Sequence, residues 1–100
     1  MKRKITKEER EFFRAVMSLS SEEECAAFFD DVCTIKEMQA LTQRLSVAYM
    51  LDSGEKYQDI EKKTGASTAT ISRVNKCLNY GSGGYRAVIE KTQNSGEGEA

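Results

Sequence analysis

No proline occurs among the 100 residues of this chain, so the residue that breaks helices most effectively is absent. Apolar residues recur at helical spacing, and the patterns Thr6–Glu9 and Thr34–Glu37 are capping boxes that mark helix starts. These signals predict an all-α protein with six helices. The expected helices cover about 7–18, 21–32, a long segment from 35 to the Ser53–Gly54 pair, 57–64, 68–79 and 85–92, followed by a polar, disordered tail over 93–100.

The net charge of −1 conceals segments of opposite sign. Residues 1–20 carry a net charge of +3, residues 21–37 carry −5 and residues 57–80 carry +2. The field of the whole chain therefore does not attract nucleic acid, and any attraction must be local. The acidic block at 22–24 and 30–31 is interpreted as a solvated helix face. The phenylalanines at 12–13 and 28–29 are interpreted as a core or a dimer seam.

Several classes of protein are excluded by what the sequence lacks. It has three cysteines, no CxxC pair and no histidine, so we expect partly buried, reduced thiols and no zinc site. No catalytic constellation is visible, which argues against an enzyme. The sequence has no apolar stretch near 20 residues and no signal-peptide pattern, so we expect neither secretion nor membrane insertion, and a cytoplasmic location.

The segment from Tyr57 to Tyr80 has the pattern of a helix-turn-helix. Gly65 supplies the conformational freedom that the sharp turn requires. The apolar residues Ile60, Ala66, Ile71 and Val74 are spaced so that one face of each helix packs against the other. The alternative interpretation is an ordinary helical hairpin that ends its first helix with glycine.

The outward face of the second helix favours DNA binding. It carries residues that are small, hydroxylic or basic, namely Thr68, Ala69, Thr70, Ser72, Arg73 and Lys76. Such residues allow close entry into the major groove and offer hydrogen bonds to bases and phosphates. Gln43 and Gln58 are weaker candidates for phosphate contacts. The acidic Glu61 and the polar Thr64 are unexpected in such a motif.

Three stretches of the chain resemble a known family. They are Thr34 to Arg44, Ser53-Gly54-Glu55, and Gly65-Ala66 with Ala69 to Arg73 and Leu78. At these positions the sequence is similar to the Trp repressor-like proteins, in particular their YerC/YecD branch. The resemblance implies an intertwined homodimer with six helices per chain, formed by a domain over 1–92, that represses transcription on double-stranded DNA at the bacterial nucleoid.

The resemblance also implies an effector site. In the Trp repressor two arginines enclose the bound tryptophan, and they match Arg44 and Arg73. Thr34 is a further candidate for this site. Val74 stands where the repressor has glycine and Cys77 stands where it has serine, so the site has less space and a weaker hydrogen-bond partner. We therefore expect no established cofactor, argue against tryptophan, and leave open an unidentified small-molecule effector.

Two further functions stay open at this stage. The chain could be a helical dimer that binds a protein partner and has lost specific DNA binding, a possibility motivated by Glu61 and the net negative charge. It could also be a ligand-sensing module without direct DNA contact.

Overall fold

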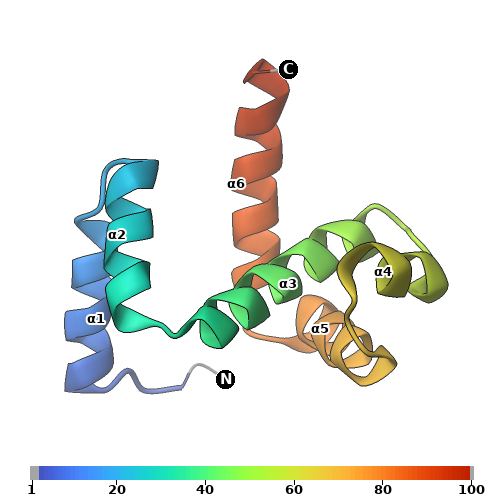
Figure 1. The fold of residues 1–100 in the computed structure, drawn as a ribbon, viewed down its shortest axis with the longest axis horizontal. Coiled ribbons are helices and arrows are strands. Elements are labelled where there is room, and N and C mark those ends of the chain that lie inside the picture. Colours follow the sequence, from blue (N-terminus) through green and yellow to red (C-terminus); the bar gives the residue numbers. More distant parts are fainter. Residues whose placement is uncertain (1–2, 100) are drawn as a thin grey trace. The chain divides into compact units, whose positions relative to one another are not determined.

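The computed structural model describes residues 3–99, and its side chains are described for residues 3–93. Figure 1 shows six helices: α1 (Lys7–Met17), α2 (Glu22–Val32), α3 (Ile35–Asp52), α4 (Tyr57–Thr64), α5 (Thr68–Tyr80) and α6 (Gly84–Glu99). Residues 3–99 contain no strand, so the predicted all-α class is confirmed. The chain divides into two compact units, Met1–Gln39 and Ala40–Ala100, and α3 begins in the first and continues in the second.

The capping boxes explain where α1 and α3 begin. The Thr6 hydroxyl accepts a hydrogen bond of 3.0 Å from the Glu9 backbone N–H, and the Glu9 carboxylate accepts one of 3.0 Å from the Thr6 N–H. Thr34 and Glu37 repeat this exchange at 3.1 and 2.8 Å. Each exchange satisfies two N–H groups that a helix start leaves without partners, so both predicted helix starts are confirmed.

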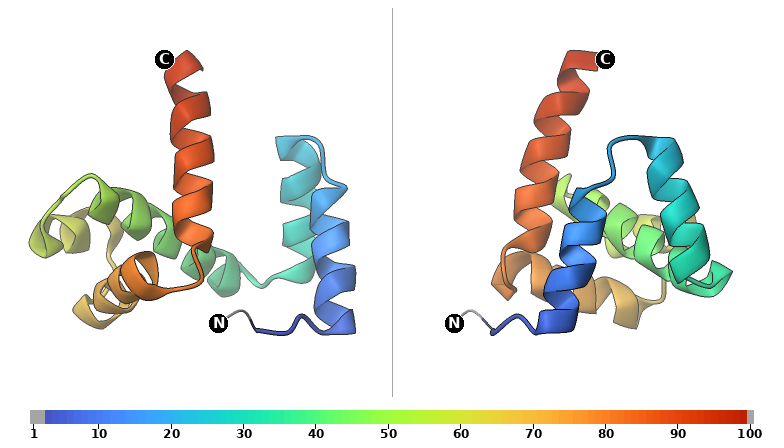
Figure 2. Two further views of the ribbon diagram at one scale, coloured as in Figure 1. Left: turned by 180° about the vertical axis from the view of Figure 1, so that it is seen from behind. Right: turned by 90° about the vertical axis from the view of Figure 1, so that its left-hand side faces the viewer.

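The first unit contains a helical hairpin. Figures 1 and 2 show that helices α1 and α2 run antiparallel. The rings of Phe12 and Phe28 join the two helices with their centroids 5.9 Å apart. No residue of α1 or α2 is buried. Met17 is 82% exposed and Ile35, at the start of α3, is 79% exposed. This unit therefore has apolar side chains but no core of its own.

The second unit holds the buried core. Helix α5 packs against both α4 and α6. The core residues come from α3 to α6 and from the turn between α4 and α5: Val47, Ala48, Ile60, Ala66, Ile71, Val74, Leu78 and Ile89. This core includes the four apolar residues that the sequence assigns to the facing sides of the motif, so that prediction is confirmed.

Helix α6 is longer than the sequence predicts. Its backbone is helical to Glu99, beyond the expected end at residue 92, while Ala100 lies outside the described residues. The disorder expected for 93–100 stays a prediction. Ile89 is buried in the core, and the Thr92 hydroxyl donates to the Val88 carbonyl at 2.8 Å. A helix anchored in this way extends at low cost because each added residue gains a hydrogen bond, and no proline stops it.

The cysteines differ partly from expectation. All three are free, Cys25 and Cys77 are exposed, and Cys33 is half-buried. The prediction of partly buried thiols is therefore wrong for Cys25 and Cys77, because the helix faces that carry them are not covered within the chain. None of the helices in the described part of the chain combines the length and apolar character that crossing a membrane requires.

Candidate nucleic-acid interface

The turn between α4 and α5 has the geometry that the sequence predicts. Gly65 adopts φ 75° and ψ 4°, in the left-handed region, and its N–H donates a hydrogen bond of 2.8 Å to the Glu61 carbonyl. A residue with a Cβ pays a steric cost in this region, and glycine does not. The chain therefore leaves α4 sharply and starts α5 three residues later, as the predicted helix-turn-helix requires.

Thr64 has a role in this turn that the sequence analysis missed. Its hydroxyl donates to the Ile60 carbonyl at 2.7 Å and accepts from the Ala66 N–H at 3.1 Å. One side chain thus bridges the end of α4 and the first residue after the glycine. The signal in the sequence was a threonine directly before the glycine, where its hydroxyl reaches the carbonyl four residues back.

Gln43 reaches the same turn from α3. Its side-chain Nε2 donates a hydrogen bond of 3.1 Å to the Thr64 backbone carbonyl, in a partly buried environment. Gln43 and Thr64 are 21 residues apart, so spacing along the chain gives no sign of this bond. The expected phosphate contact of Gln43 stays a prediction, but one of its two amide hydrogens already has a partner within the chain.

The start of α5 is capped by Ser67. Its hydroxyl accepts from the Thr70 N–H at 3.1 Å and also lies 3.1 Å from the Thr70 hydroxyl, to which it donates. This cap fixes the first turn of α5. Five of the six residues assigned to the outward face of α5 are exposed and Thr70 is half-buried; the exposed ones are Thr68, Ala69, Ser72, Arg73 and Lys76. Helix α5 contains two basic residues and no acidic residue.

Helix α4 has a mixed surface. Gln58 is exposed, as a phosphate contact requires, and the acidic Glu61 is half-buried. Lys63 forms an ion pair of 2.7 Å with Glu55, and this hydrogen bond with the Glu55 carboxylate raises the pKa of Lys63 above its ordinary value. Part of the positive charge of α4 is therefore balanced locally, and the basic residues of α5 carry more weight in attracting an anion.

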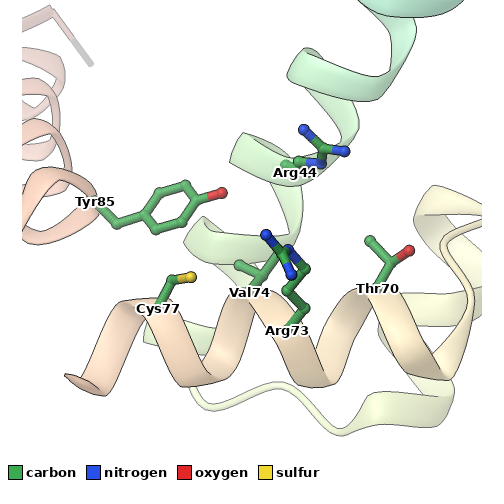
Figure 3. A pocket seen from close by; sticks show the side chains of 6 residues that line it. All are labelled: Arg44, Thr70, Arg73, Val74, Cys77 and Tyr85. Atoms are coloured by element: carbon green, nitrogen blue, oxygen red, sulfur yellow. The ribbon is translucent and has the colours of Figure 1, made fainter. Parts of the chain in front are cut away.

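A cavity of about 260 Å³ lies between α3, α5 and α6, and two residues of the outward face of α5, Thr70 and Arg73, contribute to its lining. It is lined by Arg44, Thr70, Arg73, Val74, Cys77 and Tyr85. Figure 3 shows the side chains of Arg44 and Arg73 extending into one space from α3 and α5, with the Tyr85 ring pointing toward it from α6. The sequence gives no sign of Tyr85 as a lining residue, because its position depends on how α6 packs.

Four of the five residues predicted for an effector site line this cavity together: Arg44, Arg73, Val74 and Cys77. Thr34 belongs to the first unit, where its side chain caps α3, and its assignment to an effector site stays a prediction. Val74 is only 3% exposed and is part of the core. Among the described side chains, neither Arg44 nor Arg73 takes part in an ion pair with a carboxylate.

These features define an all-α protein of the helix-turn-helix class, whose second motif helix carries two basic residues and lies beside a small cavity lined by two arginines. The family model described as Trp repressor protein matches residues 7–93. The chain belongs to the Trp repressor family, as the resemblance in the sequence predicts.

Individual proteins support this assignment. The uncharacterized protein YerC of Bacillus subtilis (strain 168) is 53% identical over 87 residues, which are 87% of this chain and 84% of YerC. A TrpR-like protein from Eubacterium eligens ATCC 27750 has a crystal structure that is similar with a TM-score of 0.84 and 52% identity, covering 86% of this chain and 89% of that one. A Trp repressor candidate from Staphylococcus aureus has a TM-score of 0.81 and 46% identity, covering 84% of each chain.

The family defines the general function. Its members are regulators and not enzymes, so the chain is not an enzyme. The family and the TrpR-like folds place the chain among DNA-binding regulators of transcription. The similarity to YerC identifies the branch.

Proposed function

We propose that this chain is a sequence-specific transcription repressor that binds double-stranded DNA as a homodimer, with α5 as the recognition helix. The observation that carries the proposal is the division of α5 into two faces. Ile71 and Val74 are buried in the core, whereas Ser72, Arg73 and Lys76 are exposed. The packing that fixes the helix therefore also presents its basic and hydroxylic residues outward. The proposed DNA-binding domain covers 1–92 and acts at the nucleoid, in the bacterial cytoplasm.

Each exposed residue has a chemical role in this proposal. Thr68, Ala69 and Thr70 are small enough for the start of α5 to approach the bases, and their methyl groups suit a thymine methyl. Arg73 suits the paired acceptors of guanine or a phosphate, and Lys76 suits a phosphate. Ser72 and, from α4, Gln58 add hydrogen bonds to the backbone of the DNA.

The homodimer is supported by apolar surface that each unit leaves accessible. No residue of α1 or α2 in the first unit is buried, and the apolar side chains of Phe12, Phe13 and Met17 are exposed. The second unit has a largely apolar cavity of about 580 Å³, whose lining includes Leu45, Tyr85 and Val88. A second copy of the chain would cover such surfaces and remove them from water.

Selection of DNA from a random pool, followed by mobility-shift measurements, tests the proposal. We expect the wild-type chain to select one operator and to bind it more weakly as salt rises. The double variant Thr70→Ala, Arg73→Ala should lose specific binding, while the control Lys91→Ala, on α6, should retain it. Unchanged operator binding by the double variant would exclude α5 as the reading helix, and failure to select any operator would favour a protein-binding module.

A second candidate function is ligand sensing at the cavity beside α5. It is favoured by Arg44 and Arg73, since two guanidinium groups without a carboxylate partner suit a small anion such as a carboxylate or phosphate. Val74 and Cys77 in the lining argue against tryptophan. Thermal-shift measurements with amino acids and nucleotides test this candidate. Stabilisation by tryptophan would reverse the argument from Val74, and the absence of any shift would remove the candidate.

A further inference from the structure

The turn of the helix-turn-helix ends in a backbone carbonyl that the motif itself does not satisfy. The last four carbonyls of a helix have no intrahelical donor. At the end of α4, the Gly65 N–H bonds to Glu61, and the Ala66 N–H bonds to the Thr64 hydroxyl. The half-buried Thr64 carbonyl receives its hydrogen bond from outside the motif, from Gln43 on α3.

This bond adds a directional constraint that apolar packing alone does not supply. The contacts of Ile60, Ala66 and Ile71 bring α4 and α5 together, but apolar packing has little directional preference. A hydrogen bond is directional, and it joins the turn to the long helix α3. Arg73 lies five residues along α5, about 8 Å from its start at a rise of about 1.5 Å per residue. A small rotation at the turn therefore displaces Arg73 by a large fraction of an ångström.

We propose that Gln43 is a positioning residue that sets the orientation of the recognition helix by holding the Thr64 carbonyl to α3. The inference rests on the proposed DNA-binding function, and it assigns Gln43 a role different from a direct phosphate contact. Gln43 acts through the turn. Its side-chain amide donates to the Thr64 carbonyl, and the Thr64 hydroxyl accepts from the Ala66 N–H. Helix α5 begins two residues after Ala66, so its orientation depends on these two hydrogen bonds. Removing the amide donor leaves the fold but loosens the angle at which α5 meets the bases.

The two roles of Gln43 predict different losses. A phosphate contact contributes equally to every DNA sequence, so its removal weakens specific and non-specific binding alike. A positioning residue affects the contacts to bases, so its removal weakens operator binding and leaves non-specific binding unchanged. A positioning residue also changes the turn when no DNA is present, which a phosphate contact does not.

The test uses the variant Gln43→Met, which keeps the length of the side chain and removes the donor. Gln58→Met is the matched control, because it makes the same chemical change at an exposed glutamine proposed to contact phosphate. For Gln43→Met we expect about tenfold weaker binding to the selected operator, the loss that one net hydrogen bond implies, with unchanged binding to random DNA. Gln58→Met should weaken both to the same extent.

Hydrogen exchange of the DNA-free protein gives the second measurement. In Gln43→Met we expect faster exchange at the amides of Gly65 and Ala66 and unchanged exchange at Ile71, in the core. If this variant does not fold, Gln43→Glu replaces it, because glutamate keeps the length and polarity of the side chain but lacks the amide donor that holds the Thr64 carbonyl. It should reproduce the faster exchange at Gly65 and Ala66.

Three results would overturn the inference: equal losses on operator and random DNA, unchanged operator binding, or unchanged exchange at Gly65 and Ala66. Failure of the wild-type chain to select an operator would instead overturn the proposed function. The exchange measurement would still decide whether Gln43 holds the turn, so the two failures are distinguishable.

Discussion

Asp52 and Arg86 lie 34 residues apart in the chain and form an ion pair that joins the end of α3 to the start of α6. Arg86 also donates a hydrogen bond of 3.4 Å to the Asn79 side-chain oxygen near the end of α5. The Asn79 amide in turn donates to the Asn75 carbonyl at 3.0 Å. Three helices are therefore linked at one end of the second unit by a chain of polar contacts around Arg86.

We expect this ion pair to contribute little to stability, because both side chains reach solvent. They are 35% and 46% exposed, and pairs of this kind contribute about 0.5 kcal/mol. Urea unfolding of Asp52→Asn, Arg86→Met and the double variant gives the coupling energy, with Lys91→Met as the control for loss of an exposed cation. A coupling of several kcal/mol would show that water is excluded from the pair.

Glu9 provides a prediction about pH. The hydrogen bond from Arg3, and then that from the Thr6 backbone N–H, lower the pKa of Glu9 from 4.5 to about 2. Because the pKa is lower in the folded chain, the contribution of Glu9 is complete above pH 4.5 and is lost as the pH falls toward 2. An NMR titration of the Glu9 carboxyl carbon should show this low midpoint, and the helical shifts at the start of α1 should change with it.

The variant Arg3→Met separates the two causes. It removes the partner with the larger effect and leaves the capping box, so the midpoint of Glu9 should rise part of the way to its ordinary value. A midpoint near 4.5 in the wild-type chain would contradict the contact between Arg3 and Glu9. Lys2, the neighbour of Arg3 in the basic N-terminal segment, lies outside the described residues.

Local signals in the sequence were sufficient to predict most of the fold. Thr6 and Thr34 indicate helix starts because each exchanges hydrogen bonds with a glutamate three residues later. Gly65 indicates the turn because glycine readily adopts the positive φ that the turn requires. Helical spacing identified Ile60, Ile71 and Val74 as facing residues, and all three are buried. These predictions succeed because each depends on interactions within a few residues.

The parts that the sequence did not predict depend on contacts between distant residues. The bond from Gln43 to the Thr64 carbonyl requires α3 to lie against the end of α4, and the position of Tyr85 in the cavity requires α6 to lie beside α3 and α5. The apolar residues Tyr85, Val88 and Ile89 indicate a helix over 85–92, but the polar residues after them give no sign that its backbone stays helical to Glu99. No local pattern reveals that α1 and α2 contain no fully buried residue, because burial depends on packing between helices.

The exposed apolar face of α1 leads to a prediction about assembly. If a second copy covers this face, Met17→Lys should weaken the dimer about tenfold or more, because a charge would then be transferred into an apolar contact. Sedimentation equilibrium over a range of concentrations measures the dissociation constant. Glu11→Lys is the control, since helical spacing places it on the opposite side of α1 from Phe13 and Met17. A monomeric wild-type chain, or equal effects of both variants, would contradict the proposed dimer seam.

The turn at Gly65 allows the backbone contribution to be measured by itself. A Cβ at Gly65 would meet no atom within 4 Å, so a substitution there creates no clash, but φ is 75°. Gly65→Ala should therefore lower the free energy of unfolding by about 1–2 kcal/mol through backbone strain alone.

Gly84→Ala is the matched control, because its Cβ also meets no atom within 4 Å and its φ is not in the left-handed region. Urea unfolding should find Gly84→Ala as stable as the wild type or slightly more stable, since alanine favours a helix. Equal stability of the two variants would mean that the turn can relax away from the left-handed conformation, and α5 would then not be held at a fixed angle.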